Sequence, residues 1–327
     1  MGNAIEGSLG LGPRCRTSKS SEGGTAANLG LQWGISCMQG WRPSMEDAHL
    51  AVPSIPGLGW EKMAAFGVMD GHGGSEVAKF CAYHLPNLIG QQPSGNIGKA
   101  LTTAFYSIDN MLTRDHNVDS YHQGCTACVA IVTEERIVVG NAGDSRAVLS
   151  RGGYAVPLSQ DHKPNLRSEQ RRIERAGGTI VNYGEYGGGP RVQGDLNLSR
   201  ALGDHRHKQD VNLHPAEQII SSEPEIKSFL RQPNDEFMIL ACDGVWDMMS
   251  NEGAVEFLSR RLQHGPGPNG EVLPRILEEL LDECCSPDLH STLGKGGDNM
   301  TAVLVHFDRS VVTWGMKHIP GILGCYL

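Results

Sequence analysis

The sequence predicts an α/β protein of the α+β kind, with antiparallel β-sheets and α-helices packed outside them. Its 327 residues, 39% of them hydrophobic and 20% charged, are enough to bury one sizeable core. Short apolar runs alternate with longer amphipathic ones. Strand pairs come before and after helix pairs instead of alternating with them one for one, and this order favours antiparallel sheets over a doubly wound parallel sheet.

The predicted strands are short apolar or alternating runs, and the predicted helices are longer runs with apolar residues on one face. A turn rich in glycine and proline at 264–270 separates the last two helices. The strands are expected at 32–38, 62–69, 126–133, 136–141, 147–150, 236–241 and 301–307, and the helices at 75–88, 97–113, 251–263 and 273–284.

Composition along the chain predicts three parts. Residues 1–30 are rich in Gly, Ser and Thr and hold few apolar side chains to offset the cost of ordering the backbone, so they are expected to form a flexible leader. Residues 31–308 show no linker and are expected to form a single domain. Residues 309–327 are left as a C-terminal tail.

The charge and the hydropathy restrict the partners. A net charge of -9 argues against a nucleic-acid-binding surface, which needs a basic stripe. No apolar run reaches the roughly 18 residues of a membrane span, so a cytoplasmic or nuclear protein is expected, and a monomer is the simplest state. Gly2 could accept a myristoyl chain, which would give reversible membrane association, although Glu6 stands where that motif has Ser or Thr.

Four acidic residues stand where predicted strands begin or end. Asp70 and Asp243 each follow an apolar strand and precede a glycine, Asp144 lies in the turn after a third strand, and Asp298 stands before the last strand. One such acid is usually a helix cap or a turn former. Four of them in the same kind of position indicate a shared site.

If these strand ends meet at one edge, the carboxylates repel one another unless cations lie between them. Oxygen ligands without His or Cys partners favour Mg²⁺ or Mn²⁺ over zinc. Two such ions roughly 3.5 to 4 Å apart lower the pKa of a water molecule and hold a phosphoryl group for in-line attack. The pattern therefore predicts hydrolysis of a phosphate ester.

An ordered set of motifs over about residues 33 to 307 resembles the type 2C protein phosphatases. The two clearest are the Asp70–Gly71–His72–Gly73–Gly74 turn and the run from Asp243 to Asp247. Each motif alone is weak, but their order and spacing together are specific. The others are 42–49, 141–146, 161–164, 172–178, 199–204 and 298–301.

The resemblance implies a central sandwich of two antiparallel β-sheets flanked by pairs of helices, with two cations at one end. Asp70 would bridge both ions, the Gly71 carbonyl would bind one, and Asp243 and Asp298 would bind the other. Glu46 and Asp47 would contact the ions through water. Asp144, with Asp243, would suit a third and weaker ion.

The resemblance also implies roles for Arg42, for His72 and for one loop. Arg42 would clamp the phosphate, because a guanidinium offers forked donors to two oxygens. His72 would be the general acid that protonates the departing serine or threonine oxygen. The stretch 164–191 would form a flap beside the active site and is where substrate selection is expected.

The expected function is therefore hydrolysis of phosphoserine and phosphothreonine in phosphorylated protein substrates by a metal-activated water. Two alternatives stay open. One is a catalytically weak relative that acts as a phosphoprotein-binding or regulatory module, and the other is a phosphodiesterase or nucleotidase with the same metal chemistry. A cysteine-based phosphatase is excluded, because none of the nine cysteines has an Arg six positions later.

Overall fold

The computed structural model describes residues 14–184 and 189–308. Its helices are α1 (Glu76–Gly90), α2 (Ile97–Leu112), α3 (Arg167–Arg175), α4 (Asp243–Trp246), α5 (Asn251–His264) and α6 (Val272–Cys284). Its strands are β1 (Arg16–Ala26), β2 (Leu31–Gly40), β3 (Ala48–Val52), β4 (Ala64–Met69), β5 (Gly71–His72), β6 (Gly124–Cys125), β7 (Ala127–Val132), β8 (Arg136–Ala142), β9 (Arg146–Arg151), β10 (Tyr154–Pro157), β11 (Ile180–Asn182), β12 (Pro190–Val192), β13 (Leu202–Gly203), β14 (Glu225–Leu230), β15 (Asp235–Ala241) and β16 (Met300–Phe307).

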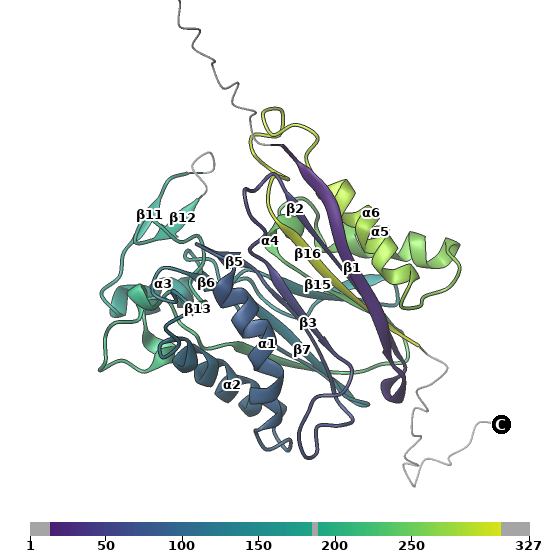
Figure 1. Ribbon diagram of the computed structural model, residues 1–327, viewed down its shortest axis with the longest axis horizontal. Coiled ribbons are helices and arrows are strands. Elements are labelled where there is room, and N and C mark those ends of the chain that lie inside the picture. Colours follow the sequence, from purple (N-terminus) through teal and green to yellow (C-terminus); the bar gives the residue numbers. More distant parts are fainter. Residues whose placement is uncertain (1–13, 185–188, 309–327) are drawn as a thin grey trace, which may run out of the picture.

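Two large antiparallel sheets form the centre of the molecule (Figure 1). The first has six strands in the order β1-β2-β16-β15-β9-β10, and the second has five in the order β14-β8-β7-β4-β3. A buried apolar cluster from both sheets, with Ile35 and Phe66 among its members, fills the space between them. The predicted antiparallel sandwich is confirmed.

Helix pairs cover the outer faces of the sandwich, as predicted. The apolar sides of α1 and α2 share a core with the five-stranded sheet, and those of α5 and α6 share another with the six-stranded sheet. On α6, Leu273, Ile276, Leu277, Leu280 and Cys284 recur at helical spacing and are all buried. This burial of one apolar stripe explains why the helix lies flat on its sheet.

The prediction of a flexible leader is wrong for residues 16–26. They form strand β1, which pairs with β2 from Arg16 opposite Gly40 to Ala26 opposite Leu31. Most of its side chains are exposed, so they gave no apolar pattern, and the strand is held by backbone hydrogen bonds at a sheet edge. Residues 1–13 and the predicted tail 309–327 lie outside the described residues.

The sequence analysis also did not predict several short or strongly charged elements. Helix α3 has only Glu169 and Ile173 buried, which leaves too little apolar periodicity to predict it. It stands with the β11–β12 hairpin in the stretch predicted to be a flap. Within the described residues, no helix is both long and apolar enough to cross a membrane.

The register of the six-stranded sheet brings the acidic turns to one end of the sandwich. Ala241 at the end of β15 pairs with Ala302 near the start of β16 and with Arg146 at the start of β9. Asp243, Asp298 and Asp144 lie just beyond these three positions in the chain. Antiparallel pairing therefore places the three acids at the same edge.

Candidate active site

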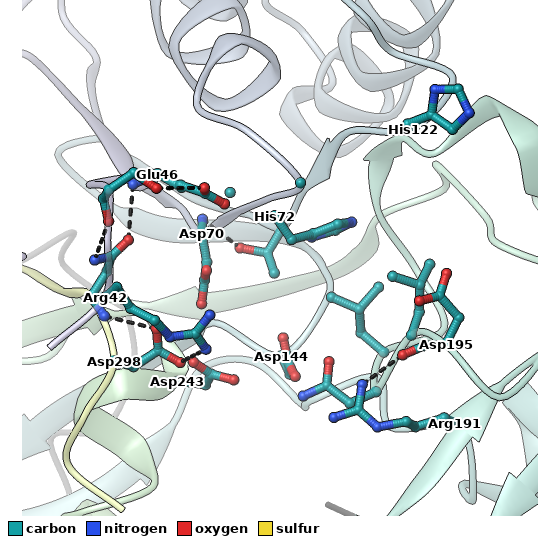
Figure 2. A pocket seen from close by; sticks show the side chains of 18 of the residues that line it. Arg42, Glu46, Asp70, His72, His122, Asp144, Arg191, Asp195, Asp243 and Asp298 are labelled. Carbon is teal, nitrogen blue, oxygen red and sulfur yellow. Dashed lines mark hydrogen bonds and ion pairs between the residues drawn. The ribbon is translucent and has the colours of Figure 1, made fainter. Parts of the chain in front are cut away.

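One cavity of about 420 Å³ collects most of the predicted site residues (Figure 2). Carboxylates from four separate turns face the same space. The predicted site residues that line it are Arg42, Glu46, Asp70, Gly71, His72, Asp144, Asp243 and Asp298. The ninth, Asp47, does not line the cavity and lies buried behind it.

Asp70 and Gly71 are fixed by backbone contacts at the break between β4 and β5. The Asp70 amide donates to Thr126 Oγ1 at 2.9 Å, and the Thr126 amide donates to the Asp70 carbonyl at 2.9 Å. A Cβ atom at position 71 would lie 2.2 Å from the carbonyl oxygen of Glu46. Position 71 therefore requires glycine, and the chain passes close enough to the cavity for its carbonyl to serve as a ligand.

Asp243 and Asp298 meet because two chain segments touch. Asp243 is the first residue of α4, and a Cβ atom on its neighbour Gly244 would lie 2.0 Å from the carbonyl oxygen of Asn299. The Asn299 amide donates to Asp298 Oδ1 at 2.7 Å, which orients that carboxylate. The glycine thus allows the start of α4 to pack against the loop that carries Asp298.

Each acid of the cavity disfavours the ionised form of its neighbours. Burial first, and then the negative charges of Asp243, Asp47, Asp144 and Asp298, raise the pKa of Asp70 well above its ordinary value. Burial and the charges of Asp144 and Asp298 likewise raise the pKa of Asp243. Cations between the carboxylates would relieve this repulsion.

The donor set fits hard divalent cations. Asp47 and Asp70 carboxylate oxygens and Cys242 Sγ lie within 4.8 Å of one another. Both Asp47 oxygens are buried without a well-formed hydrogen bond, although Thr301 and Cys242 lie beside them, and burial raises the pKa of Asp47 to about 6. Burial also raises the pKa of Cys242, which keeps it a thiol, so carboxylate and carbonyl oxygens are the available ligands.

Asp144 already has a cationic partner. Its carboxylate is 2% exposed and forms an ion pair with the Lys163 ammonium group. Burial alone would lower the pKa of Lys163, but the charge and hydrogen bond of Asp144, together with the charges of Asp243 and Asp247, raise it overall, so the lysine stays protonated. A cation bound at Asp144 would have to compete with this amine.

Arg42 lies at the cavity mouth beside the acids. Its Nη2 atom is 2.7 Å from Asp298 Oδ2, and its side chain is 58% exposed, so the other guanidinium donors remain accessible.

Glu46 is held by three contacts: its amide donates to Asn299 Oδ1, and its carboxylate accepts from Ser44 Oγ at 2.8 Å and from the Gly74 amide at 3.3 Å.

His72 has a buried partner to which the sequence analysis assigned no role. Its Nε2 atom is 2.7 Å from Oδ2 of Asp204, a residue 132 positions away whose side chain is fully buried. Burial alone would lower the pKa of His72, but the charge and hydrogen bond of Asp204 raise it overall. Asp204 is the last residue of the motif 199–204, and its place in that motif is the only sequence signal that indicates a functional role for it.

Except for Arg191, which lies in the predicted flap 164–191, the wall opposite the acids was not predicted. It includes His122, Arg191, Asp195 and Arg206, and Figure 2 shows His122, Arg191 and Asp195 across the cavity from Asp298. The Arg206 guanidinium forms an ion pair with the Asp195 carboxylate, and Arg191 Nη1 donates to the Asp195 carbonyl at 2.6 Å. The cavity therefore has an acidic side and a side that carries two arginines.

This chain is similar to proteins of one known family. The family model described as Protein phosphatase 2C matches residues 31–293. Protein phosphatase 2C homolog 2 of Schizosaccharomyces pombe is 44% identical over 303 residues, which cover 90% of this chain and 78% of that protein. Probable protein phosphatase 2C 11 of Oryza sativa subsp. japonica is 37% identical over 346 residues, covering 90% of each chain.

Solved structures share the fold. A crystal structure of a phosphatase from a pathogenic strain of Toxoplasma gondii has a TM-score of 0.73 and 25% identity, covering 89% of this chain and 96% of that one. The crystal structure of serine-threonine phosphatase 2C from Toxoplasma gondii has a TM-score of 0.69 and 23% identity, covering 90% of this chain and 98% of that one.

Proposed function

The chain belongs to the protein phosphatase 2C family, and we propose that the acidic cavity is the centre at which it removes phosphate from serine and threonine side chains of proteins. Family membership makes the protein a serine/threonine protein phosphatase that acts on phosphoproteins. The roles of its individual residues and the number of its metal ions are the proposal.

The single observation that carries the proposal is the gathering of Arg42, His72 and the carboxylates of Asp70, Asp243 and Asp298 around one cavity. These residues come from four different segments, since Asp70 and His72 share one turn. A fold needs no such concentration of buried, mutually repelling acids for its own stability, since removing charge from the site would relieve the cost. Their presence together supports a catalytic use.

We assign the cation ligands from this arrangement. Asp70 and the Gly71 carbonyl would hold one Mg²⁺ or Mn²⁺, and Asp70, Asp243 and Asp298 would hold a second. Asp47, buried behind Asp70, and Glu46, beside Gly71, would orient water at the ions. When bound, such ions lower the pKa of water and neutralise phosphate charge.

Arg42 and His72 would act on different parts of the substrate. Arg42 would bind two phosphate oxygens with its accessible donors and fix the phosphate next to the acids. His72 would donate a proton to the departing serine or threonine oxygen. Asp204, bonded to Nε2, holds the ring in place, so the proton would have to be delivered from the other ring nitrogen or after the ring turns.

The test compares metal dependence in matched variants. The wild-type chain is expected to release phosphate from a phosphoserine peptide only with Mg²⁺ or Mn²⁺, and Asp70→Asn is expected to lose this activity. The control is Asp282→Asn, because that carboxylate is 58% exposed on α6 and pairs with Lys19. A second readout, the increase in Tm on adding Mn²⁺, should be lost only in Asp70→Asn. Phosphate release that survives a chelator would refute the proposal.

The same assays separate the alternatives. A regulatory module that only binds phosphoproteins would bind the peptide without turnover in either metal. A nucleotidase or phosphodiesterase would release product from a nucleotide or a diester faster than from the phosphoserine peptide. The presence of Arg42 together with Asp70, Asp243 and Asp298 favours the phosphatase over the inactive relative.

Two further proposals concern the whole chain. We propose that it acts as a monomer and that Gly2 accepts a myristoyl group, which by itself would give only reversible membrane binding. Gly2 lies outside the described residues. Intact mass of protein from its native host would test the modification, and sedimentation would test the oligomeric state.

A further inference from the structure

The two accessible cysteines of the described residues lie next to each other. Of the eight cysteines there, six are buried, and only Cys15 and Cys285 are half-buried. Their sulfur atoms are 3.4 Å apart, although the residues are separated by 270 positions in the sequence. Solvent oxidants would therefore reach these two thiols before the thiol of Cys242 beside the acidic cavity.

The surroundings of the pair permit a covalent bond. A disulfide needs sulfur atoms about 2.05 Å apart, so the two would have to approach by about 1.4 Å. Cys15 stands directly before β1, whose pairing with β2 shifts register between Arg16 and Lys19. Lys19 Nζ also holds Asp282 on α6 at 2.6 Å, which keeps the strand end beside the end of the helix. The end of β1 can adjust without disturbing the regular part of the sheet.

The pair stands at the base of the loop that carries Asp298. Cys285 is followed by Ser286, whose amide donates to the Gly296 carbonyl at 2.8 Å and whose carbonyl accepts from Trp41 Nε1 at 2.9 Å. The Trp41 amide in turn donates to the Gly297 carbonyl at 3.2 Å. A covalent bond at Cys285 would therefore fix one end of this loop and the corner next to Arg42.

We propose that Cys15 and Cys285 are a modification site at which hydroperoxides form a reversible disulfide that fastens β1 to the base of the Asp298 loop. The Cys15 thiol reduces the peroxide O–O bond, giving a sulfenic acid and releasing an alcohol or water. The Cys285 sulfur then attacks the sulfenic sulfur, an S–S bond forms, and the sulfenic oxygen leaves as water. Two thiols are oxidised by two electrons in total, and one peroxide is reduced.

The order of the two steps follows from the environments. Burial, together with the hydrogen bond between Cys285 and Cys15, raises the pKa of Cys285 to about 12, which leaves little of it as the nucleophilic thiolate. Its proximity compensates in the second step, which is intramolecular. The disulfide closes a very long loop in the unfolded chain, so it is expected to stabilise the folded protein.

The experiment uses the full chain with Cys325→Ser, which removes a thiol outside the described residues. After treatment with hydrogen peroxide and alkylation of free thiols, digestion at glutamate should yield fragment 7–22 linked to fragment 284–327, and dithiothreitol should separate them. Cys15→Ser and Cys285→Ser should each abolish the link. Cys284→Ser is the matched control, because that neighbouring thiol is only 1% exposed and its loss should leave the link intact.

The consequence is measured on the same samples. The oxidised protein should have a higher Tm than the reduced one and a several-fold longer half-life of phosphatase activity at raised temperature, and neither change should occur in Cys15→Ser. No linked fragment, or a link that persists in Cys285→Ser, would overturn the assignment. A link that forms without any change in Tm or half-life would overturn the stabilising role.

Discussion

Replacing Glu169 by Gln tests whether a buried ion cluster stabilises the segment that runs from the flap to Asp204, the partner of His72. Glu169 on α3 is 2% exposed and pairs with both Arg172 and Arg200. Its Oε2 also accepts from Ser199 Oγ at 2.8 Å. Glutamine keeps the shape and removes the charge, so both guanidinium groups would lose their counter-ion in a nearly dry site.

The magnitude follows from the shift in protonation. Burial alone would raise the pKa of Glu169, but the hydrogen bond from Arg200 and the charges of Arg172 and Arg200 lower it from 4.5 to about 2. At 1.36 kcal/mol per pKa unit, the ionised carboxylate contributes about 3 kcal/mol to the free energy of unfolding at pH 7. Because the folded pKa is depressed, this contribution is complete above pH 4.5 and is lost as the pH falls toward 2.

The assay is urea unfolding of wild type and Glu169→Gln at several pH values. The variant should be about 3 kcal/mol less stable at pH 7 and at pH 5, and the difference should shrink by about 1.4 kcal/mol per pH unit below pH 4.5. The control is Glu279→Gln, whose carboxylate is 59% exposed and pairs with Arg261, and which should change stability by less than about 1 kcal/mol. A difference for Glu169→Gln that is equally small, or that does not depend on pH, would refute the reasoning.

Three further predictions concern the site and the core. Asp204→Asn and His72→Asn should slow hydrolysis of a phosphoserine peptide by about 10²-fold but slow para-nitrophenyl phosphate much less, because nitrophenolate leaves without a proton; equal losses on both substrates would contradict this. Lys163→Met should let a cation bind near Asp144 at lower Mn²⁺ concentration in calorimetry, and an unchanged titration would count against competition. Leu304→Ala, at a fully buried position in β16, should cost about 2 to 5 kcal/mol in urea unfolding, and a cost below 1 kcal/mol would show that the site collapses.

The parts of the fold that were predictable are those with strong hydrophobic periodicity. Strands β4, β7 and β15 are almost wholly buried and read as apolar runs, and α6 shows a clear apolar stripe. Strand β1 was not predictable, because its stability comes from pairing with β2 and its side chains are mostly exposed. Backbone pairing between distant segments leaves no mark on local composition.

The site residues that could be predicted are likewise those next to strands with a clear apolar pattern. Asp70, Asp144, Asp243 and Asp298 could be proposed because each stands next to an apolar strand, and a sandwich of antiparallel strands brings such positions to one edge.

Asp204 and the arginines of the opposite wall had no such marker. Asp204 follows the two-residue strand β13, whose register with β6, and that of β6 with β5, bring Gly203 and His72 both opposite Gly124. This three-stranded sheet is what carries Asp204 to within 2.7 Å of His72. Asp204 acts only by positioning His72, so its role becomes visible only when the sheet places β13 and β5 on either side of β6.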